Sequence, residues 1–178
     1  MAIATLWIPT PLGEVQFLAE AKLSPSSKLM LKAVRFQPAL PPGRSVAACY
    51  AVLFKIFEVE SPLTVRFQAS LHSEATIQQS PHTGEALEAL EWSDWHHLVM
   101  VGMEDCPYLQ ARMGSPSATE ESFTYSPGAL TVHARAEPNQ PFSLHFVIAW
   151  NPLPEPKDSS CWFAVEQPHS AIELAVGQ

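Results

Sequence analysis

The sequence has few cysteines and few glycines, the residues that build disulfide frameworks and phosphate-binding loops. Its three cysteines, Cys49, Cys106 and Cys161, are odd in number and far apart, and no CxxC spacing occurs. This pattern favours reduced, buried thiols over disulfides and indicates a cytoplasmic protein. Only seven glycines are present, with no Gly-rich phosphate cradle and no HExxH or GxSxG motif. We therefore expect no cofactor, and no motif fixes a catalytic function.

Positive charge is also scarce. Ten Lys and Arg stand against 18 Asp and Glu, which gives a net charge of -8. Nucleic acids and anionic membranes select basic surfaces, so neither is an expected partner, whereas a basic protein would be attracted. The first lysine is Lys22, and Pro9, Pro11 and Glu14 interrupt the apolar start. The N-terminal segment therefore predicts neither a signal peptide nor a membrane span.

The length and the apolar content predict one folded domain over residues 1–178. Hydrophobic residues make up 47% of the chain and charged residues 16%, which is enough apolar surface for a substantial core. The 17 prolines separate short segments. We expect a mainly β or α+β fold, an antiparallel sandwich or partly open barrel with one or two helices.

Alternating apolar residues predict several strands. Residues 15–23 and 29–36 should form strands of one hairpin. Residues 45–57 are apolar on every face, which leaves helix and strand open with a slight preference for strand. Further strands are expected at residues 63–71, 97–104, 108–113 and 123–125.

One segment is predicted to form a helix. Residues 84–91 combine good helix formers with an acidic first turn. Leu87 and Leu90 would dock this helix on the sheet, while Glu85, Glu88 and Glu91 would form an acidic ridge facing water.

The last third of the chain predicts a three-stranded meander over residues 129–137, 142–150 and 160–166. If a tight loop joins the first two strands, His133 lies opposite His145 and Arg135 lies opposite Ser143. His133, Arg135 and His145 are thus candidates for a ligand, metal or general-base site, since imidazole titrates near neutral pH.

Two other groups of residues are candidates for chemistry. Asp94, His96, His97, Glu104 and Asp105 gather carboxylates and imidazoles without a known zinc spacing, so a helix-to-strand junction is the simpler interpretation. A thiolate at Cys161, paired with His145 or His169, has no local support, and a buried thiol is favoured there.

The leading functional hypothesis is a protein-binding module that neutralises a basic partner, like an inhibitor or an immunity protein. Tryptophan anchors interfaces, and an acidic rim suits a basic partner. A small-molecule-binding β-barrel or sandwich is the alternative, a hydrolase or metal enzyme using strand histidines is third, and an unpaired edge strand would permit a homo-oligomer. The expected partner-binding residues are Glu85, Glu88, Glu91, Trp92, Asp94 and Trp95.

Overall fold

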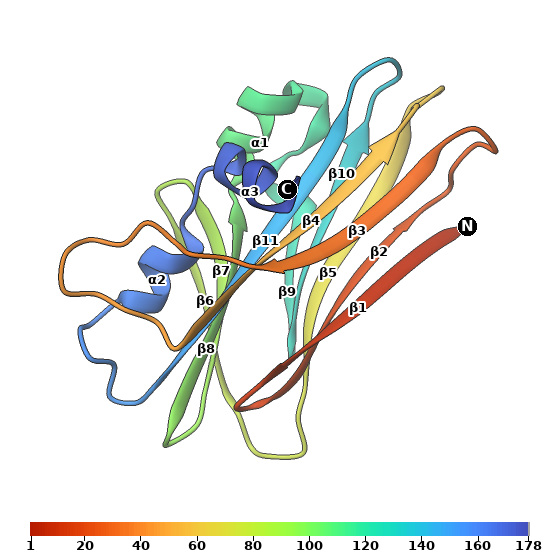
Figure 1. Cartoon of the computed structure of the whole chain (residues 1–178). Coiled ribbons are helices and arrows are strands. Elements are labelled where there is room, and N and C mark those ends of the chain that lie inside the picture. Colours follow the sequence, from red (N-terminus) through yellow and green to blue (C-terminus); the bar gives the residue numbers. More distant parts are fainter. Residues whose placement is uncertain (178) are drawn as a thin grey trace.

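Two antiparallel sheets stack face to face, as Figure 1 shows in a computed structural model that describes residues 1–177. The five-stranded sheet has the order β1 (Ala2–Thr10), β2 (Gly13–Ala21), β5 (Leu63–His72), β10 (Ala129–Ala136) and β9 (Phe123–Ser126). The six-stranded sheet has the order β3 (Lys28–Arg35), β4 (Ala48–Phe57), β11 (Phe142–Pro152), β8 (His97–Glu104), β7 (Leu87–Ser93) and β6 (Gln78–Gly84). The expected mainly β, antiparallel fold class is confirmed.

The main core lies between the sheets. Alternate residues of each strand point inward, so Phe17 and Phe67 of one sheet meet Phe146 of the other at ring separations of 5.7 and 4.7 Å. The opposite face of β11 is buried as well, with Val147 and Ala149 in a second apolar cluster. A strand that is buried on both faces has a continuous run of apolar residues in its sequence.

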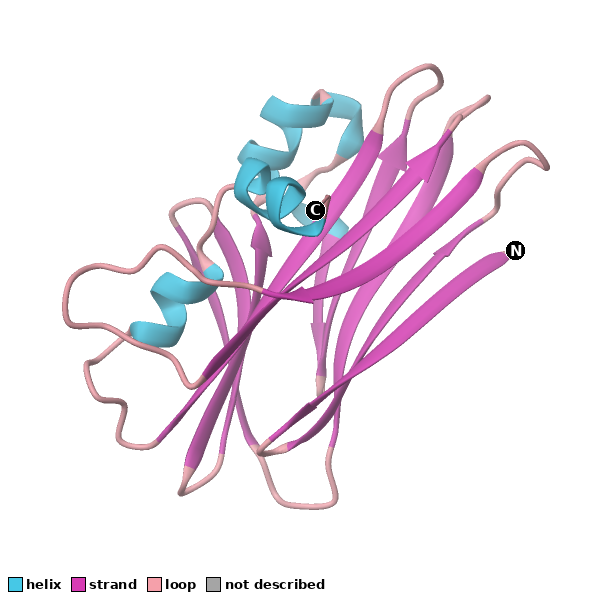
Figure 2. Ribbon diagram, in the orientation of Figure 1, coloured by secondary structure: helices cyan, strands magenta, loops and turns pink. Residues whose placement is uncertain are grey.

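Three α-helices cover the outer face and one end of the six-stranded sheet (Figure 2). They are α1 (Cys106–Met113), α2 (Ser160–Val165) and α3 (His169–Val176), with 3-10 turns at Ser115–Ser117 and Glu120–Ser122. The close packing of α2 against the sheet depends on Gly102 of β8, because an added Cβ there would lie only 2.9 Å from Val165 Cγ2 of α2. No helix within residues 1–177 is long and apolar enough to cross a membrane.

Most of the strands predicted by alternation are present. The segments predicted at residues 15–23, 29–36, 63–71, 97–104 and 123–125 correspond to β2, β3, β5, β8 and β9, and the ambiguous segment 45–57 contains strand β4. The predicted hairpin between the first two is wrong, because β2 pairs with β1 and β5, whereas β3 pairs with β4.

The helix predicted over residues 84–91 is wrong. Gly84 ends β6, Ala86 adopts a φ of 68° in the turn, and Leu87 starts β7. Strand β7 pairs with both β6 and β8, and it buries side chains on both faces. These non-local contacts outweigh local helix propensity.

The predicted strands 108–113 and 160–166 are also wrong, since they form α1 and α2. The meander is therefore absent. Strand β10 pairs with β5 and β9, and β11 pairs with β4 and β8, so the chain changes sheet between them. Each of the two strands has an apolar face that must be buried. Because the chain crosses from one sheet to the other between β10 and β11, each strand buries this face in the core between the sheets.

Candidate functional site

Polar side chains gather at the ends of β8 and β11, beneath α1 and α3. The pairing of Val147 with Gly102 places His145 level with Glu104, the last residue of β8, on the same outer face. His169 begins α3 above them. Glu104, His145 and His169 are all buried, which is rare for such groups unless they have partners.

Arg112 of α1 is the partner of Glu104. Asp105 caps α1 by accepting a hydrogen bond from the Tyr108 N–H at 3.1 Å, and the helix then carries Arg112 back over the sheet. Arg112 Nη2 and Nε donate to Glu104 Oε1 at 2.6 and 3.1 Å, and Nε also lies 3.3 Å from Oε2. The guanidinium thereby neutralises a carboxylate that burial would otherwise disfavour.

Ser143 of β11 connects this pair to α3. Arg112 donates to Ser143 Oγ at 3.1 Å and to its carbonyl oxygen at 2.8 Å. The Ser143 hydroxyl in turn donates to Glu173 Oε1 at 3.2 Å, and its oxygen lies 2.9 Å from His169 Nε2. One hydroxyl of β11 therefore joins groups from two other segments of the chain, α1 and α3.

The two buried histidines face each other. His145 Nδ1 lies 2.7 Å from His169 Nδ1, so one ring donates its proton to the lone pair of the other. Burial, the neighbouring His169 and Arg112 hold the pKa of His145 well below its usual value. Burial and Arg112 also lower the pKa of His169, against the opposing effect of Glu104 and Glu173. Both imidazoles are accordingly neutral at pH 7.

Glu173 closes the cluster on its more exposed side. Its Oε1 lies 3.2 Å from His169 Nε2 and 3.6 Å from Lys55 Nζ. Partial burial acts to raise its pKa, but His169 and Lys55 outweigh this effect and the pKa lies below its usual value. Glu173 is thus an ionised acceptor for the Nε2 proton of His169.

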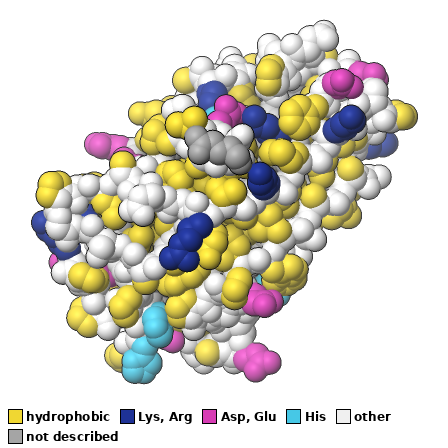
Figure 3. All heavy atoms as spheres, in the orientation of Figure 1, with side chains coloured by type: hydrophobic (Ala, Val, Ile, Leu, Met, Phe, Trp, Pro, Cys, Tyr) yellow, Lys and Arg dark blue, Asp and Glu magenta, His cyan; other side chains and the backbone are white. Residues whose placement is uncertain are grey.

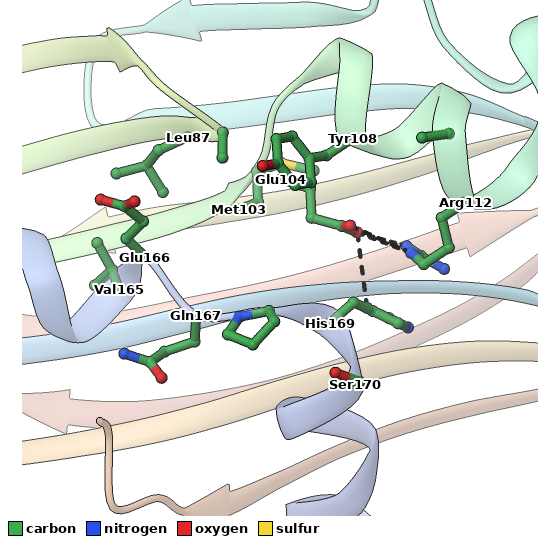
Figure 4. A pocket seen from close by; sticks show the side chains of 13 residues that line it. Leu87, Met103, Glu104, Tyr108, Arg112, Val165, Glu166, Gln167, His169 and Ser170 are labelled. Carbon is green, nitrogen blue, oxygen red and sulfur yellow. Dashed lines mark hydrogen bonds and ion pairs between the residues drawn. The ribbon is translucent and has the colours of Figure 1, made fainter. Parts of the chain in front are cut away.

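A cavity of about 510 Å³ opens beside this cluster (Figure 4). Glu104 and His169 both line it, and their side chains approach each other where the sheet meets α3. Most of the other lining is apolar. The lining residues are Ala86, Leu87, Met103, Glu104, Tyr108, Ala111, Arg112, Val165, Glu166, Gln167, Pro168, His169 and Ser170.

The structure separates the three candidate ligand-binding residues. His145 lies in the buried cluster, but His133 and Arg135 are exposed on the outer face of the five-stranded sheet. His133 lies opposite Arg66 of β5, and Arg135 pairs with Glu137 at 2.6 Å. The predicted contact between His133 and His145 is therefore wrong, because their strands belong to different sheets.

The six predicted partner-binding residues do not form one exposed ridge. Trp92 and Glu88 point into the protein, where Trp92 Nε1 donates to Gln79 Oε1 at 3.0 Å and Tyr125 donates to Glu88. Trp95 is 90% exposed. Glu85 is exposed beyond the other end of β7, while Glu91 and Asp94 are half-buried. Acidic side chains are likewise scattered over the face seen in Figure 3.

Asp94 has a structural role in the β7–β8 turn. Its Oδ1 accepts hydrogen bonds from the backbone N–H groups of His96 and His97, both at 2.7 Å, and these bonds lower its pKa. Glu104 lies at the opposite end of β8 from the turn with Asp94, His96 and His97, so these residues do not form one site. Cys161 is buried in α2, where burial and Glu155 raise its pKa.

Sequence reasoning did not assign Arg112, Ser143 or Glu173 to a site, and it considered His169 only beside Cys161. A signal was present in β11, where Ser143, His145 and Asn151 interrupt an otherwise apolar strand at alternate positions. Buried polar residues at one face of a strand need partners, and these come here from covering helices.

In comparisons with known proteins, no family model, curated protein or solved structure matches the chain.

Proposed function

We propose that this protein binds a small molecule in the cavity between the β8–α1 segment and the α2–α3 segment. The observation that carries the proposal is the cavity itself, about 510 Å³ in volume, with mostly apolar walls and with Glu104, Arg112 and His169 together beside the buried cluster. Ligand sites commonly have this size, and a few polar groups in them orient the ligand.

The lining suggests the kind of molecule. Leu87, Met103 and Val165 offer an apolar surface, while Glu104, Arg112 and His169 offer acceptors and donors. A ligand with an apolar body and a polar head group suits this division. The head would lie against the buried cluster, where removal from water strengthens hydrogen bonds.

The test is native mass spectrometry of the protein purified gently from its source cells, compared with an Ala111→Trp variant. Ala111 lines the cavity, so an indole there should fill it. We expect an organic adduct on the natural protein and its loss from the variant. Ala75→Trp, an exposed change in the β5–β6 loop, is the control. An adduct retained by Ala111→Trp would exclude this cavity.

A basic protein partner is the second candidate function. The observation that favours it is Trp95, 90% exposed in a turn that Asp94 holds in place. An exposed aromatic on an ordered turn of an acidic protein suits an inhibitor-like contact. The three free, buried cysteines support the cytoplasmic location proposed with it.

This second candidate predicts that a basic chain co-purifies with the protein and is lost from Trp95→Ala. Trp7→Ala, which removes another exposed indole from strand β1, should retain it. A partner that binds Trp95→Ala with unchanged affinity would remove this turn from consideration.

A further inference from the structure

Three side chains of the buried cluster offer metal-ligand atoms to one point. His145 Nδ1 and His169 Nδ1 are 2.7 Å apart, and Glu104 Oε1 lies 3.9 and 3.7 Å from them. The circle through three atoms with these separations has a radius of about 2.0 Å, which is the zinc–nitrogen and zinc–oxygen bond length. We propose that Glu104, His145 and His169 bind one divalent first-row transition-metal ion, with zinc as the probe.

The three ligands come from β8, β11 and α3, so the site is not a local sequence motif. Two imidazoles and one carboxylate suit zinc or iron(II) better than calcium or magnesium, which prefer oxygen ligands. In the structure one histidine donates its Nδ1 proton to the other. On metal binding that proton moves to Nε2 of the same ring. To reach tetrahedral angles the two nitrogens separate, and Glu104 Oε1 moves closer to both of them.

The residues around the ligands have the arrangement expected of supporting groups. His169 Nε2 lies 3.2 Å from Glu173 Oε1 and 2.9 Å from Ser143 Oγ, which favours a proton on Nε2 and a lone pair on Nδ1. Metal-bound histidines usually donate their other N–H to such an acceptor.

Arg112 has two opposing effects on this site. Its hydrogen bonds fix the orientation of Glu104, but its positive charge lies close to the proposed cation. We therefore expect micromolar rather than picomolar affinity for zinc. Arg112 Nε lies 3.1 Å from Oε1 and 3.3 Å from Oε2, so its N–H can turn to Oε2 and leave one acceptor position of Oε1 for the metal.

The open side of the site faces the cavity. Glu104 and His169 line the cavity and His145 does not, so a fourth ligand would enter from there. Three protein ligands with one open position are characteristic of zinc sites that bind water or substrate. This step rests on the proposed function, and it narrows the ligand to molecules whose head group coordinates a metal, such as a carboxylate or a hydroxamate.

The experiment is a zinc titration of the full, chelator-treated chain, followed by calorimetry and native mass spectrometry. We expect one zinc ion per chain. Glu104→Gln and His169→Gln should each weaken binding more than tenfold, and Glu173→Gln should weaken it about tenfold through His169. His133→Gln, on the other sheet, is the matched control and should bind normally. Circular dichroism of every variant checks that the fold is intact.

Absence of zinc binding, or equal affinity in the natural protein, Glu104→Gln and His169→Gln, would overturn the proposal. Nitrogen NMR of the imidazoles provides a measurement without mutation, because metal binding should shift the Nδ1 resonances of His145 and His169 and no others. An unchanged pair of resonances at saturating zinc would also overturn it.

The experiments distinguish failure of the proposed metal site from failure of the proposed ligand site. Zinc binding by Ala111→Trp without the organic adduct would support both, since that variant fills the cavity and leaves all three ligands. An organic adduct on a natural protein that binds no zinc would overturn the metal site and leave the proposed function standing.

Discussion

Arg112 Nη2 lies 2.6 Å from Glu104 Oε1, and this contact ties α1 to the end of the strand that precedes it. Both side chains are largely shielded from solvent, and Arg112 makes further bonds to Ser143. The pair thus joins a helix, β8 and β11 at the rim of the cavity.

Removal of Arg112 should destabilise the protein strongly. Arg112→Ala leaves the Glu104 carboxylate buried without its counter-charge, and breaking a buried pair in this way costs about 3–5 kcal/mol. Urea denaturation measures the change in the free energy of unfolding. The matched control is Arg135→Ala, whose pair with Glu137 is exposed and should contribute less than about 1 kcal/mol. Equal losses in the two variants would contradict the role of Arg112.

Close packing of α2 on the sheet should depend on Gly102. In Gly102→Ala, the new methyl would lie 2.9 Å from both Leu87 Cδ1 and Val165 Cγ2. Leu87 can rotate away, but Val165 is held on α2, so we expect a loss of about 1–3 kcal/mol in urea denaturation. Val165→Ala should relieve the clash in the double variant, making the combined loss smaller than the sum. Strict additivity would argue against this clash.

Two tryptophans three residues apart should respond differently to truncation. Trp92 is 1% exposed in the main core, and Trp92→Ala should cost about 3–5 kcal/mol of unfolding free energy. Trp95 is 90% exposed, and Trp95→Ala should change stability by no more than about 0.5 kcal/mol. Thermal and urea denaturation of both variants test this. A large loss in Trp95→Ala would mean that the indole is covered in solution.

Local alternation identified several strands correctly, but it did not identify all of them and it did not give their arrangement. Val15, Phe17 and Ala19 are buried and alternate with the less buried Gln16 and Leu18, and this segment is β2 as predicted. The segment around Leu87 has helix formers and no clean alternation, because β7 is buried on both faces and its neighbours decide its structure. The pairing of strands distant in sequence is not encoded in a local period.

The same limit applies to the candidate site. His145 was identified as a candidate, but its actual neighbour is His169 and not His133. The α1 helix that brings Arg112 to Glu104 begins after Asp105 and covers residues 108–113, which were predicted as a strand. Asp at an N-cap followed by an early proline is equally a helix start. The sequence thus contains a signal for the start of α1, but no local pattern in it shows that β8, β11 and α3 converge.

The buried thiols should be unreactive in the folded protein. Burial raises the pKa of Cys49 to about 12, and burial together with Glu155 raises that of Cys161. Since the thiolate is the reacting species, almost none is present at about pH 8, whereas an unfolded cysteine is partly ionised there. We expect iodoacetamide to modify neither residue in the native state and all three cysteines in concentrated guanidinium chloride.

An exposed cysteine introduced by Ser115→Cys provides the matched control, because it should react in the native protein at the rate of a free thiol. Peptide mass spectrometry distinguishes the sites over time. Rapid native modification of Cys161 would show that α2 detaches readily from Gly102 and the sheet. Since Val165 of α2 lines the cavity, that outcome would also mean that the cavity wall opens on the timescale of the reaction.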